Sequence, residues 1–313
     1  MQESEKNINY EEFDCPICNK KVFRVLKKRN ERLLLQASRS KSVFAASGHV
    51  KLFDQLVECQ ICKHVMTNPR LNSKDLVFEY TNSTEDTHFL QNRFRVKTFS
   101  RALKKILKEV DINQNANTIN LLDIGCASGA FLSAATKMTN WKIEGIEPSK
   151  SMVAFGKREY DVDINQGVFV SESYSDRKFD VISLWDVLEH INEPNLLLND
   201  ISKVLSSNGH IIINVPNLDS IVARFMGYLW PFYLAVHIHY FKNQTIKKLL
   251  KMQGLKIVYT KPYIQQLGLG YVLFRGLQSL NQSFKYSKLL RGLDRFPVSY
   301  NLGQTTYVAK KCK

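Results

Sequence analysis

The chain alternates between short apolar runs and longer amphipathic segments. Short apolar runs are typical of buried parallel strands, whereas apolar residues spaced three and four apart are typical of helices. The runs predict strands at residues 121–124, 142–146, 162–164, from 179, 211–215, 256–260 and 305–309. Amphipathic segments separate most of these runs, so the pattern predicts an α/β fold built on an open sheet.

An amphipathic helix is predicted ahead of the first of these strands, over residues 87–110. Its apolar positions, spaced three and four apart, are Phe99, Leu103, Ile106, Leu107 and Val110. The Lys and Arg residues of this helix are interpreted as a solvated face. An Asn-rich run at 111–118 predicts a linker, so that the core domain begins near residue 119.

A tight turn follows the strand at 121–124. Gly125 and Gly129 flank Cys126, Ala127 and Ser128, and a helix opens at residue 130. Such a strand–turn–helix unit presents free backbone N–H groups to a ligand, and its small residues permit close approach. Glu147 ends the next strand, about 20 residues after the turn, where an acid suits hydrogen bonding to ribose hydroxyls.

The spacing Asp123-x-Gly125-x-x-x-Gly129 with Glu147 downstream resembles the class I S-adenosylmethionine-dependent methyltransferases. A nicotinamide site, the alternative, would show Gly-x-Gly-x-x-Gly. The resemblance implies a Rossmann-like, seven-stranded, mostly parallel sheet with an antiparallel last strand at the edge. It also implies S-adenosylmethionine as cofactor, with methionine near the glycine turn, ribose at Glu147 and adenine near Gly167 and Val168. The implied cofactor residues are Asp123, Gly125, Ala127, Gly129, Glu147, Gly167, Val168 and Asp186.

Two Cys-x-x-Cys pairs near the N-terminus predict a metal site. Four thiolates from Cys15, Cys18, Cys59 and Cys62 suit a closed tetrahedral zinc site with a structural role. Redox-active or unpaired thiols are the alternative. Short strands are expected at 22–26 and 32–35, which would make this part a small zinc ribbon.

The stretch 58–70, followed by Glu79 and Tyr80, resembles the zinc-ribbon-bearing subgroup of these methyltransferases, which often acts on sugar nucleotides and surface polysaccharides. The resemblance implies a sugar or glycan precursor, either free or lipid-linked, as acceptor of an O- or C-methylation. The expected domains are a zinc ribbon at 1–75, a linker helix at 76–118 and a methyltransferase domain at 119–313. Insertions are expected at 219–240 and 263–300, the second of them helical.

Three histidines are candidates for deprotonating the acceptor, because imidazole has a suitable pKa. His190 lies after the fourth strand beside Glu189. His237 and His239 lie two residues apart in a segment expected to be extended, which would place both side chains on one side of it. A purely structural role is the alternative for each. Asp186 and Asn217 are expected to line the substrate edge, and Glu189 is expected to orient His190.

The charge and composition of the chain limit the kinds of partner and the compartment that we expect. The chain carries a net charge of +15, and residues 263–313 hold 8 Lys and Arg against 1 Asp. Residues 221–238 form a nearly uncharged aromatic run, interpreted as a lid over the substrate, with contact to a membrane surface as the rival. The N-terminus lacks the pattern of a signal peptide, and the paired cysteines favour a reducing, cytoplasmic compartment.

A protein that binds nucleic acid through its ribbon and has lost catalysis is the competing function, because residues 20–32 are basic. Against it, no aromatic–basic stacking platform is evident. A nucleic-acid methyltransferase is a third alternative, but the Asn/Asp-Pro-Pro-aromatic motif of amino-group methylation is absent after the fourth strand, where Trp185 and Asp186 stand.

Overall fold

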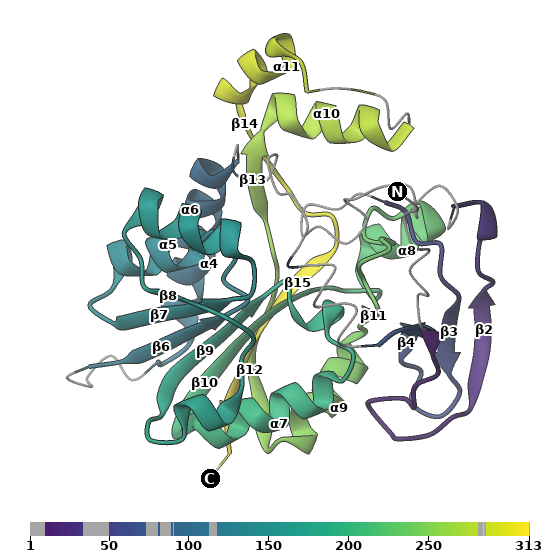
Figure 1. Cartoon of the computed structure of the whole chain (residues 1–313), viewed down its shortest axis with the longest axis horizontal. Helices are drawn as coiled ribbons and strands as arrows, with labels where there is room; N and C mark the ends of the chain where they lie inside the picture. The colour runs from purple at the N-terminus through teal and green to yellow at the C-terminus, as the bar shows by residue number, and fades with distance from the viewer. Residues whose placement is uncertain are drawn as a thin grey trace, which may run out of the picture.

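A seven-stranded sheet forms the centre of the molecule (Figure 1). The computed structural model describes residues 10–33, 50–72, 81, 89, 91–112, 118–280, 284 and 286–312. The strands of the sheet are β6 (Asn120–Ile124), β7 (Lys142–Glu147), β8 (Ile164–Gln166), β9 (Phe179–Trp185), β10 (Leu205–Pro216), β12 (Leu255–Pro262) and β15 (Gln304–Lys311). All the predicted strands of the sheet are therefore confirmed.

The strand order is β12-β15-β10-β9-β6-β7-β8. The five strands from β10 to β8 are parallel to their neighbours, and β15 runs antiparallel to both β10 and β12. This confirms a mostly parallel sheet whose last strand is antiparallel. However, β15 is not at the edge, because Tyr307 and Val308 are buried between β10 and β12, and the partly exposed β12 takes the edge position.

Helices cover both faces of this sheet (Figure 1). One face carries α4 (Asn92–Glu109), α5 (Ala130–Met138) and α6 (Lys150–Tyr160), and the other carries α7 (Pro194–Val204) and α9 (Asn243–Met252). The predicted apolar stripe of α4 does face the core: Leu103 and Ile106 are buried against the sheet, and Phe99 packs beside them. The helix begins at Asn92, and most of residues 85–90 lie outside the described part of the chain.

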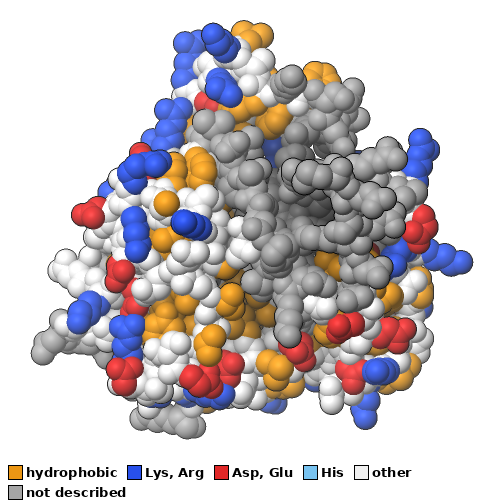
Figure 2. All heavy atoms as spheres, in the orientation of Figure 1, with side chains coloured by type: hydrophobic (Ala, Val, Ile, Leu, Met, Phe, Trp, Pro, Cys, Tyr) orange, Lys and Arg blue, Asp and Glu red, His pale blue; other side chains and the backbone are white. Residues whose placement is uncertain are grey.

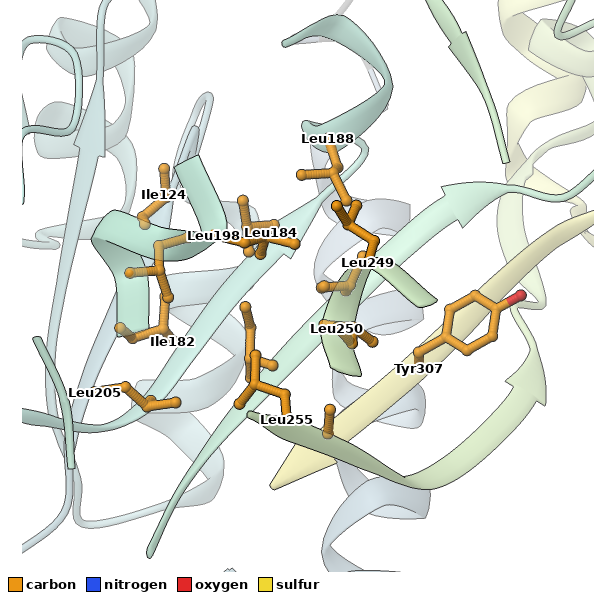
Figure 3. Close-up of a cluster of buried hydrophobic side chains, with 14 of the residues drawn as sticks. Ile124, Ile182, Leu184, Leu188, Leu198, Leu205, Leu249, Leu250, Leu255 and Tyr307 are labelled. Carbon is orange, nitrogen blue, oxygen red and sulfur yellow. The ribbon is translucent and has the colours of Figure 1, made fainter. Parts of the chain in front are cut away.

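The core on the α7–α9 face is closely packed (Figure 3). Ile182 and Leu184 of β9 meet Leu198 of α7, and Leu249 and Leu250 of α9 close the other side; all five are fully buried. Burying a side chain of this size contributes roughly 1.5–3 kcal/mol relative to exposure. This core fixes β9 and β10, whose carboxyl ends carry the polar loops described below.

The two cysteine pairs lie in a smaller, four-stranded antiparallel sheet, at the right of Figure 1. Its order is β11 (His239–Tyr240), β4 (Val65–Thr67), β3 (Leu56–Cys59) and β2 (Phe23–Lys27). The strand predicted at 22–26 is confirmed within one residue. The strand predicted at 32–35 is wrong where the chain is described, because residues 31–33 are helical and the Asn30 side chain accepts from the Leu33 N–H at 3.1 Å. β1 (Tyr10–Glu11) pairs with β5 (Arg70–Leu71) beside this sheet.

The segment 263–300 contains more than the predicted helices. It opens with β13 (Gln265–Gly268) and closes with β14 (Pro297–Tyr300), which pair antiparallel, and α10 (Leu269–Leu280) and α11 (Lys288–Gly292) lie between them. We call residues 263–300 the cap. The cap packs on α4 through an apolar cluster that includes Phe94 and Tyr271. The space-filling view shows Lys and Arg side chains over the cap and along both sides of this face (Figure 2).

The segment 219–240 adds α8 (Ile221–Met226), η3 (Gly227–Leu229) and β11. The segment 219–240 leaves the large sheet after β10. Because its strand β11 pairs with β4, it supplies the fourth strand of the small sheet. The remaining short helical turns are η1 (Ser171–Tyr174), η2 (Leu188–His190) and η4 (Leu293–Arg295). Within the described residues, no helix has the length and apolar character needed to cross a membrane.

Candidate functional site

The carboxyl ends of the parallel strands gather the polar residues that the sequence singled out. The turn at Gly125 follows β6, Glu147 ends β7, Gly167 follows β8 and Asp186 follows β9. Because β8, β7, β6 and β9 are neighbours in the sheet, these four positions lie along one edge. Ligands of open α/β sheets bind at such an edge.

The glycine turn has the backbone conformation that its spacing predicts. Gly125 and Gly129 have φ of 68° and 75°, and Ala127 adopts φ of 46° although it carries a Cβ. A Cβ on Gly125 would lie 2.7 Å from Cγ2 of Val187, so the turn also packs closely against the loop after β9. Glycine is therefore required at position 125 on two grounds, its backbone angle and its contact.

The Glu147 carboxylate is hydrogen-bonded to the backbone of the glycine turn. One carboxylate oxygen accepts the Ala127 N–H at 3.0 Å and the other accepts the Ser149 N–H at 2.8 Å. The Glu147 side chain is fully buried. The structure thus brings together the turn and the acid that lie 20 residues apart in the sequence, and both carboxylate oxygens accept hydrogen bonds from backbone N–H groups.

Two further acids lie on the same edge. Asp123 accepts the Ser183 hydroxyl at 2.6 Å, and burial raises the pKa of its carboxyl to about 8. Asp186 adopts φ of 57°, and its Oδ1 accepts from the amides of Asn214 and Gln304, each at 2.6 Å. Burial raises the pKa of Asp186 to about 6, against the effect of these two donors.

The predicted adenine end of the edge is open. Gly167 has φ of 152° with no atom near the position of a Cβ, and its N–H donates to the Glu147 carbonyl at 3.0 Å. The Val168 side chain is 54% exposed. An exposed apolar side chain at this point offers a surface for a flat ring.

Helix α4 contributes two polar groups that the sequence did not single out. The Asn92 side-chain oxygen accepts the Ser128 hydroxyl at 3.1 Å, while its amide nitrogen is buried without a hydrogen-bond partner in the described chain. The Nε of Arg95, one turn further, is likewise buried and unpartnered. The Arg95 charge also counteracts the rise in the pKa of Asp186, so this cation faces the site. The helical period alone could not distinguish Arg95 from the other Lys and Arg residues of this helix, which were interpreted as a solvated face.

A second cluster lies after β9 at the same edge, where η2 meets the 219–240 segment. One donor atom each from Glu189, His190 and His237 lie within 4.8 Å of one another. Neither carboxylate oxygen of Glu189 has a hydrogen-bond partner among the described residues, and burial raises its pKa well above the ordinary value. The three groups can share a proton or hold a cation.

The hydrogen bonds of this cluster fix the histidine tautomers. His190 Nδ1 lies 2.8 Å from the Val236 carbonyl, and His237 Nδ1 lies 2.8 Å from the Phe232 carbonyl. A carbonyl oxygen only accepts, so both Nδ1 atoms carry the proton and each Nε2 is left with a lone pair. Burial lowers the pKa of His190 to about 4, which keeps the ring neutral near pH 7.

His239, the third histidine, does not join this cluster. Its Nε2 donates to the Asn192 carbonyl at 3.2 Å, and its Nδ1 lies 2.9 Å from Nε2 of His64 in the small sheet. Both ring nitrogens are therefore engaged, and the side chain is buried. The expectation of one shared side for His237 and His239 fails, because only His239 is in a strand, whereas His237 lies in the preceding turn.

Arg70 ties the small sheet to the loop that carries His190. Its guanidinium donates from Nε to Asn192 Oδ1 at 2.8 Å and from Nη2 to the Asn192 carbonyl at 2.6 Å. A third bond reaches the Thr67 carbonyl at 3.1 Å, and the Ile238 N–H donates to the Glu189 carbonyl at 2.9 Å. The small sheet therefore forms one wall of the Glu189–His190–His237 cluster.

The four cysteines converge as the sequence predicts. Their sulfur atoms all lie within 4.8 Å of one another, with 3.3 Å between Cys15 and Cys62 and 3.5 Å between Cys18 and Cys59. The Cys15 thiol donates to Cys62 and thereby lowers the pKa of Cys62 to about 5. Asn19 and Lys63, which follow the knuckles, adopt φ of 54° and 62°. The four thiols can hold one metal ion.

Curated proteins with similar sequences are named for ubiquinone biosynthesis. The chain is 30% identical over 142 residues to the ubiquinone biosynthesis O-methyltransferase of Pelagibacter ubique, covering 44% of this chain and 59% of that protein. It is 24% identical over 144 residues to the mitochondrial enzyme of that name from Dictyostelium discoideum, covering 40% and 45%. The chain thus spans about half the length of these two relatives.

Among solved structures, a methyltransferase of Archaeoglobus fulgidus described as S-adenosylmethionine-dependent matches with a TM-score of 0.47 and 17% identity, covering 72% of this chain and 100% of that one. The magnesium protoporphyrin IX methyltransferase of Synechocystis matches with a TM-score of 0.46 and 12% identity, covering 74% and 89%. Residues 88–260, more than half of the chain, match a family described as a methyltransferase domain. This protein therefore belongs to that methyltransferase family and has the class I fold of the S-adenosylmethionine-dependent enzymes.

Proposed function

We propose that this protein transfers a methyl group from S-adenosylmethionine to a hydroxyl oxygen of its acceptor. The observation that carries the proposal is the position of His190. Its Nε2 lone pair, fixed by the Val236 carbonyl, belongs to the same sheet edge as the glycine turn and Glu147. A cofactor cradle beside an oriented, neutral base is what methyl transfer to a hydroxyl requires.

Several groups of the edge fit the cofactor. Glu147 would accept the ribose hydroxyls, Val168 would lie against adenine, and Asp123 with the glycine turn would face the methionine. The buried, unpartnered Arg95 Nε and Asn92 amide supply donors for a methionine carboxylate beside that turn. Bound there, S-adenosylmethionine supplies an electrophilic methyl carbon on a positively charged sulfur.

The acceptor side would supply the base. The cofactor would supply the methyl group to the acceptor oxygen and leave as the neutral thioether, and His190 Nε2 would take up the proton of the acceptor hydroxyl. The Glu189 carboxyl and His237 lie close enough to stabilise the resulting imidazolium. His239 has no free ring nitrogen and is assigned a structural role instead.

The cysteine cluster would hold zinc. Four sulfur ligands from two knuckles leave no open coordination position, so the ion would stabilise the small sheet and take no part in the transfer. The left-handed Asn19 and Lys63 support this assignment, since zinc knuckles require such a turn after each second cysteine.

The acceptor class follows from two separate arguments. The zinc-ribbon resemblance favours a sugar or glycan precursor. The names of the curated relatives, ubiquinone biosynthesis O-methyltransferases, favour instead a hydroxyl of a precursor in ubiquinone biosynthesis as a second candidate. Both acceptors present a hydroxyl, so the proposed roles of Glu147 and His190 apply to either.

The proposal is tested with purified protein and S-adenosylmethionine labelled in the methyl group. Nucleotide sugars and catechol-type acceptors are incubated separately, and transfer is measured by mass spectrometry. Methylated glycan pools in cells with and without the gene provide the matching evidence for the sugar acceptor. His190→Gln should lower kcat at least ~100-fold, whereas His239→Gln, the matched control, should retain kcat in the protein that folds.

The competing function has a distinct signature. A catalytically inactive protein that binds RNA through residues 20–32 would bind RNA in calorimetry and would not bind S-adenosylmethionine. That pair of results, or methyl transfer unaffected by both Glu147→Ala and His190→Gln, would overturn the proposal.

A further inference from the structure

Residues 221–229 present an apolar stripe to solvent. Ile221 is 85% exposed, Phe225 is 91% exposed and Leu229 is 79% exposed, and Tyr228 beside them is 56% exposed. Ile221 and Phe225 are four residues apart in α8 and therefore share one side of that helix. Tyr228 and Leu229 follow in η3, after Gly227 ends the helix. We call these four residues the 221–229 stripe.

The opposite side of the same segment is packed against the protein. Val222, Met226 and Trp230 pack on Leu52, Leu56 and Val65 of the small sheet, and Trp230 is 2% exposed. The Ser220 hydroxyl caps α8 by accepting the Ala223 N–H at 3.1 Å. The segment is therefore held in place by its inner side, and the outer stripe is not needed for the core of the protein.

Cations border the stripe. The Tyr228 hydroxyl donates to the Leu26 carbonyl at 3.2 Å, and Lys27 Nζ lies 5.7 Å from the centre of the Tyr228 ring. Lys28 follows and is exposed, as is Arg224 within α8. Residues 20–33 contain seven Lys and Arg and one Glu. Lys21, Arg24 and Arg29 of this stretch form ion pairs with acids. Lys27, Lys28 and Arg224 are therefore the cations that border the apolar side chains.

We propose that the 221–229 stripe docks this protein on an anionic lipid bilayer. Exposed Phe, Leu and Ile side chains enter the boundary between headgroups and acyl chains, and Tyr is suited to the interface itself. Lys27, Lys28 and Arg224 then face lipid phosphates. The charge of the border decides against a second copy of the chain, because two-fold pairing of the stripe would bring these cations together.

The docked orientation places the acceptor side near the lipid. The stripe begins four residues after Asn217, at the carboxyl end of β10, and the same segment continues to His237. A hydroxyl on a lipid-linked or hydrophobic acceptor could reach the Glu189–His190–His237 cluster without leaving the membrane surface. Membrane binding itself does not depend on the methyl transfer.

The experiment is co-sedimentation of the full chain with vesicles of phosphatidylcholine, with and without phosphatidylglycerol. The wild-type protein should sediment with the anionic vesicles, more weakly at high salt, and remain in solution with phosphatidylcholine alone. Phe225→Ser combined with Leu229→Ser should weaken the binding by ~10-fold or more. Leu289→Ser is the matched control, because Leu289 is 80% exposed on α11, and it should bind like wild type.

A second variant tests the charge. Lys27→Glu combined with Lys28→Glu should weaken binding to the anionic vesicles to a similar degree. Thermal melting and S-adenosylmethionine affinity of each variant show that it is folded. Absence of wild-type binding, equal binding of the Phe225/Leu229 variant, or equal binding to both vesicle types overturns the proposal. So does a wild-type dimer in analytical ultracentrifugation that this variant abolishes without any vesicle binding.

Discussion

Replacing Arg70 by methionine tests whether the small sheet supports the acceptor side of the site. Arg70 is 1% exposed, and its guanidinium donates to Asn192 Oδ1, the Asn192 carbonyl and the Thr67 carbonyl. Methionine keeps much of the apolar stem, so Arg70→Met removes these donors with little change in packing. It also removes the contact of the guanidinium with the Phe13 ring, at 4.2 Å.

The expected loss of stability follows from two opposing contributions. Each hydrogen bond from a charged donor contributes about 1.5–3 kcal/mol, so three of them together contribute ~5–9 kcal/mol. Removing the buried charge recovers several kcal/mol of its desolvation cost, roughly half of that sum. Arg70→Met should therefore lower the free energy of unfolding by about 2–4 kcal/mol.

Urea unfolding measures this loss, and Arg24→Met is the matched control. The Arg24 side chain is 63% exposed and binds Glu58 at 2.9 Å. A surface ion pair of this kind contributes less than ~1 kcal/mol. The reasoning is refuted if the two variants lose equal stability.

The same variant separates positioning from cofactor binding. Asn192 follows Glu189 and His190 in one loop, whereas the glycine turn belongs to β6 and α5. Arg70→Met should therefore lower kcat at temperatures where it is folded, while the Kd for S-adenosylmethionine stays the same. A matching loss of cofactor affinity would show that Arg70 acts through global stability.

Three further outcomes are expected. Gly125→Ala should lose about 2–4 kcal/mol and most cofactor affinity, because its Cβ would lie 2.7 Å from Val187 Cγ2. Gly254→Ala, with a similar φ of 66° and open space, should lose only ~1 kcal/mol in the same urea assay. The pKa of His190 is about 4 when folded and 6.5 when unfolded, so the unfolded state binds more protons between these values. The contribution of His190 to stability should then fall as the pH drops through this window, by at most ~2 kcal/mol at about pH 5. His190→Gln should make the urea midpoint less dependent on pH, while the buried His64, His237 and His239, whose pKa values are also lowered, keep part of that dependence. Chelation should release zinc, detected by emission spectrometry, and lower the melting temperature; Cys59→Ser should contain none.

The local chemistry of the cofactor edge was readable from the sequence. The spacing of Gly125 and Gly129 with Glu147 predicted a turn and an acid that serve one ligand, and in the structure the Ala127 N–H donates to Glu147 at 3.0 Å. Ala127, Asn19 and Lys63 each carry a Cβ, yet all three have positive φ. The surrounding turn and knuckles impose this geometry even where the residue does not favour it.

The acceptor side could not be derived in the same way. Period-two alternation placed His237 and His239 together, but β11 begins only at His239, so the two rings face different neighbours. Arg95 was indistinguishable from the solvated cations of α4, because its burial depends on the cap and on the loop that carries Asp186. No sequence pattern indicated the role of Arg70, because its partner Asn192 lies 122 residues away along the chain.

The sequence by itself determined the alternating strands and helices, the glycine turn with its acid, and the two cysteine knuckles. Each of these depends on interactions between residues close along the chain or on a fixed spacing. Only the tertiary structure decided that β11 completes the small sheet, that β15 lies inside the large one, and that His190 meets His237. These pairings join distant segments, and their free energy comes from contacts that exist only after both segments are in place.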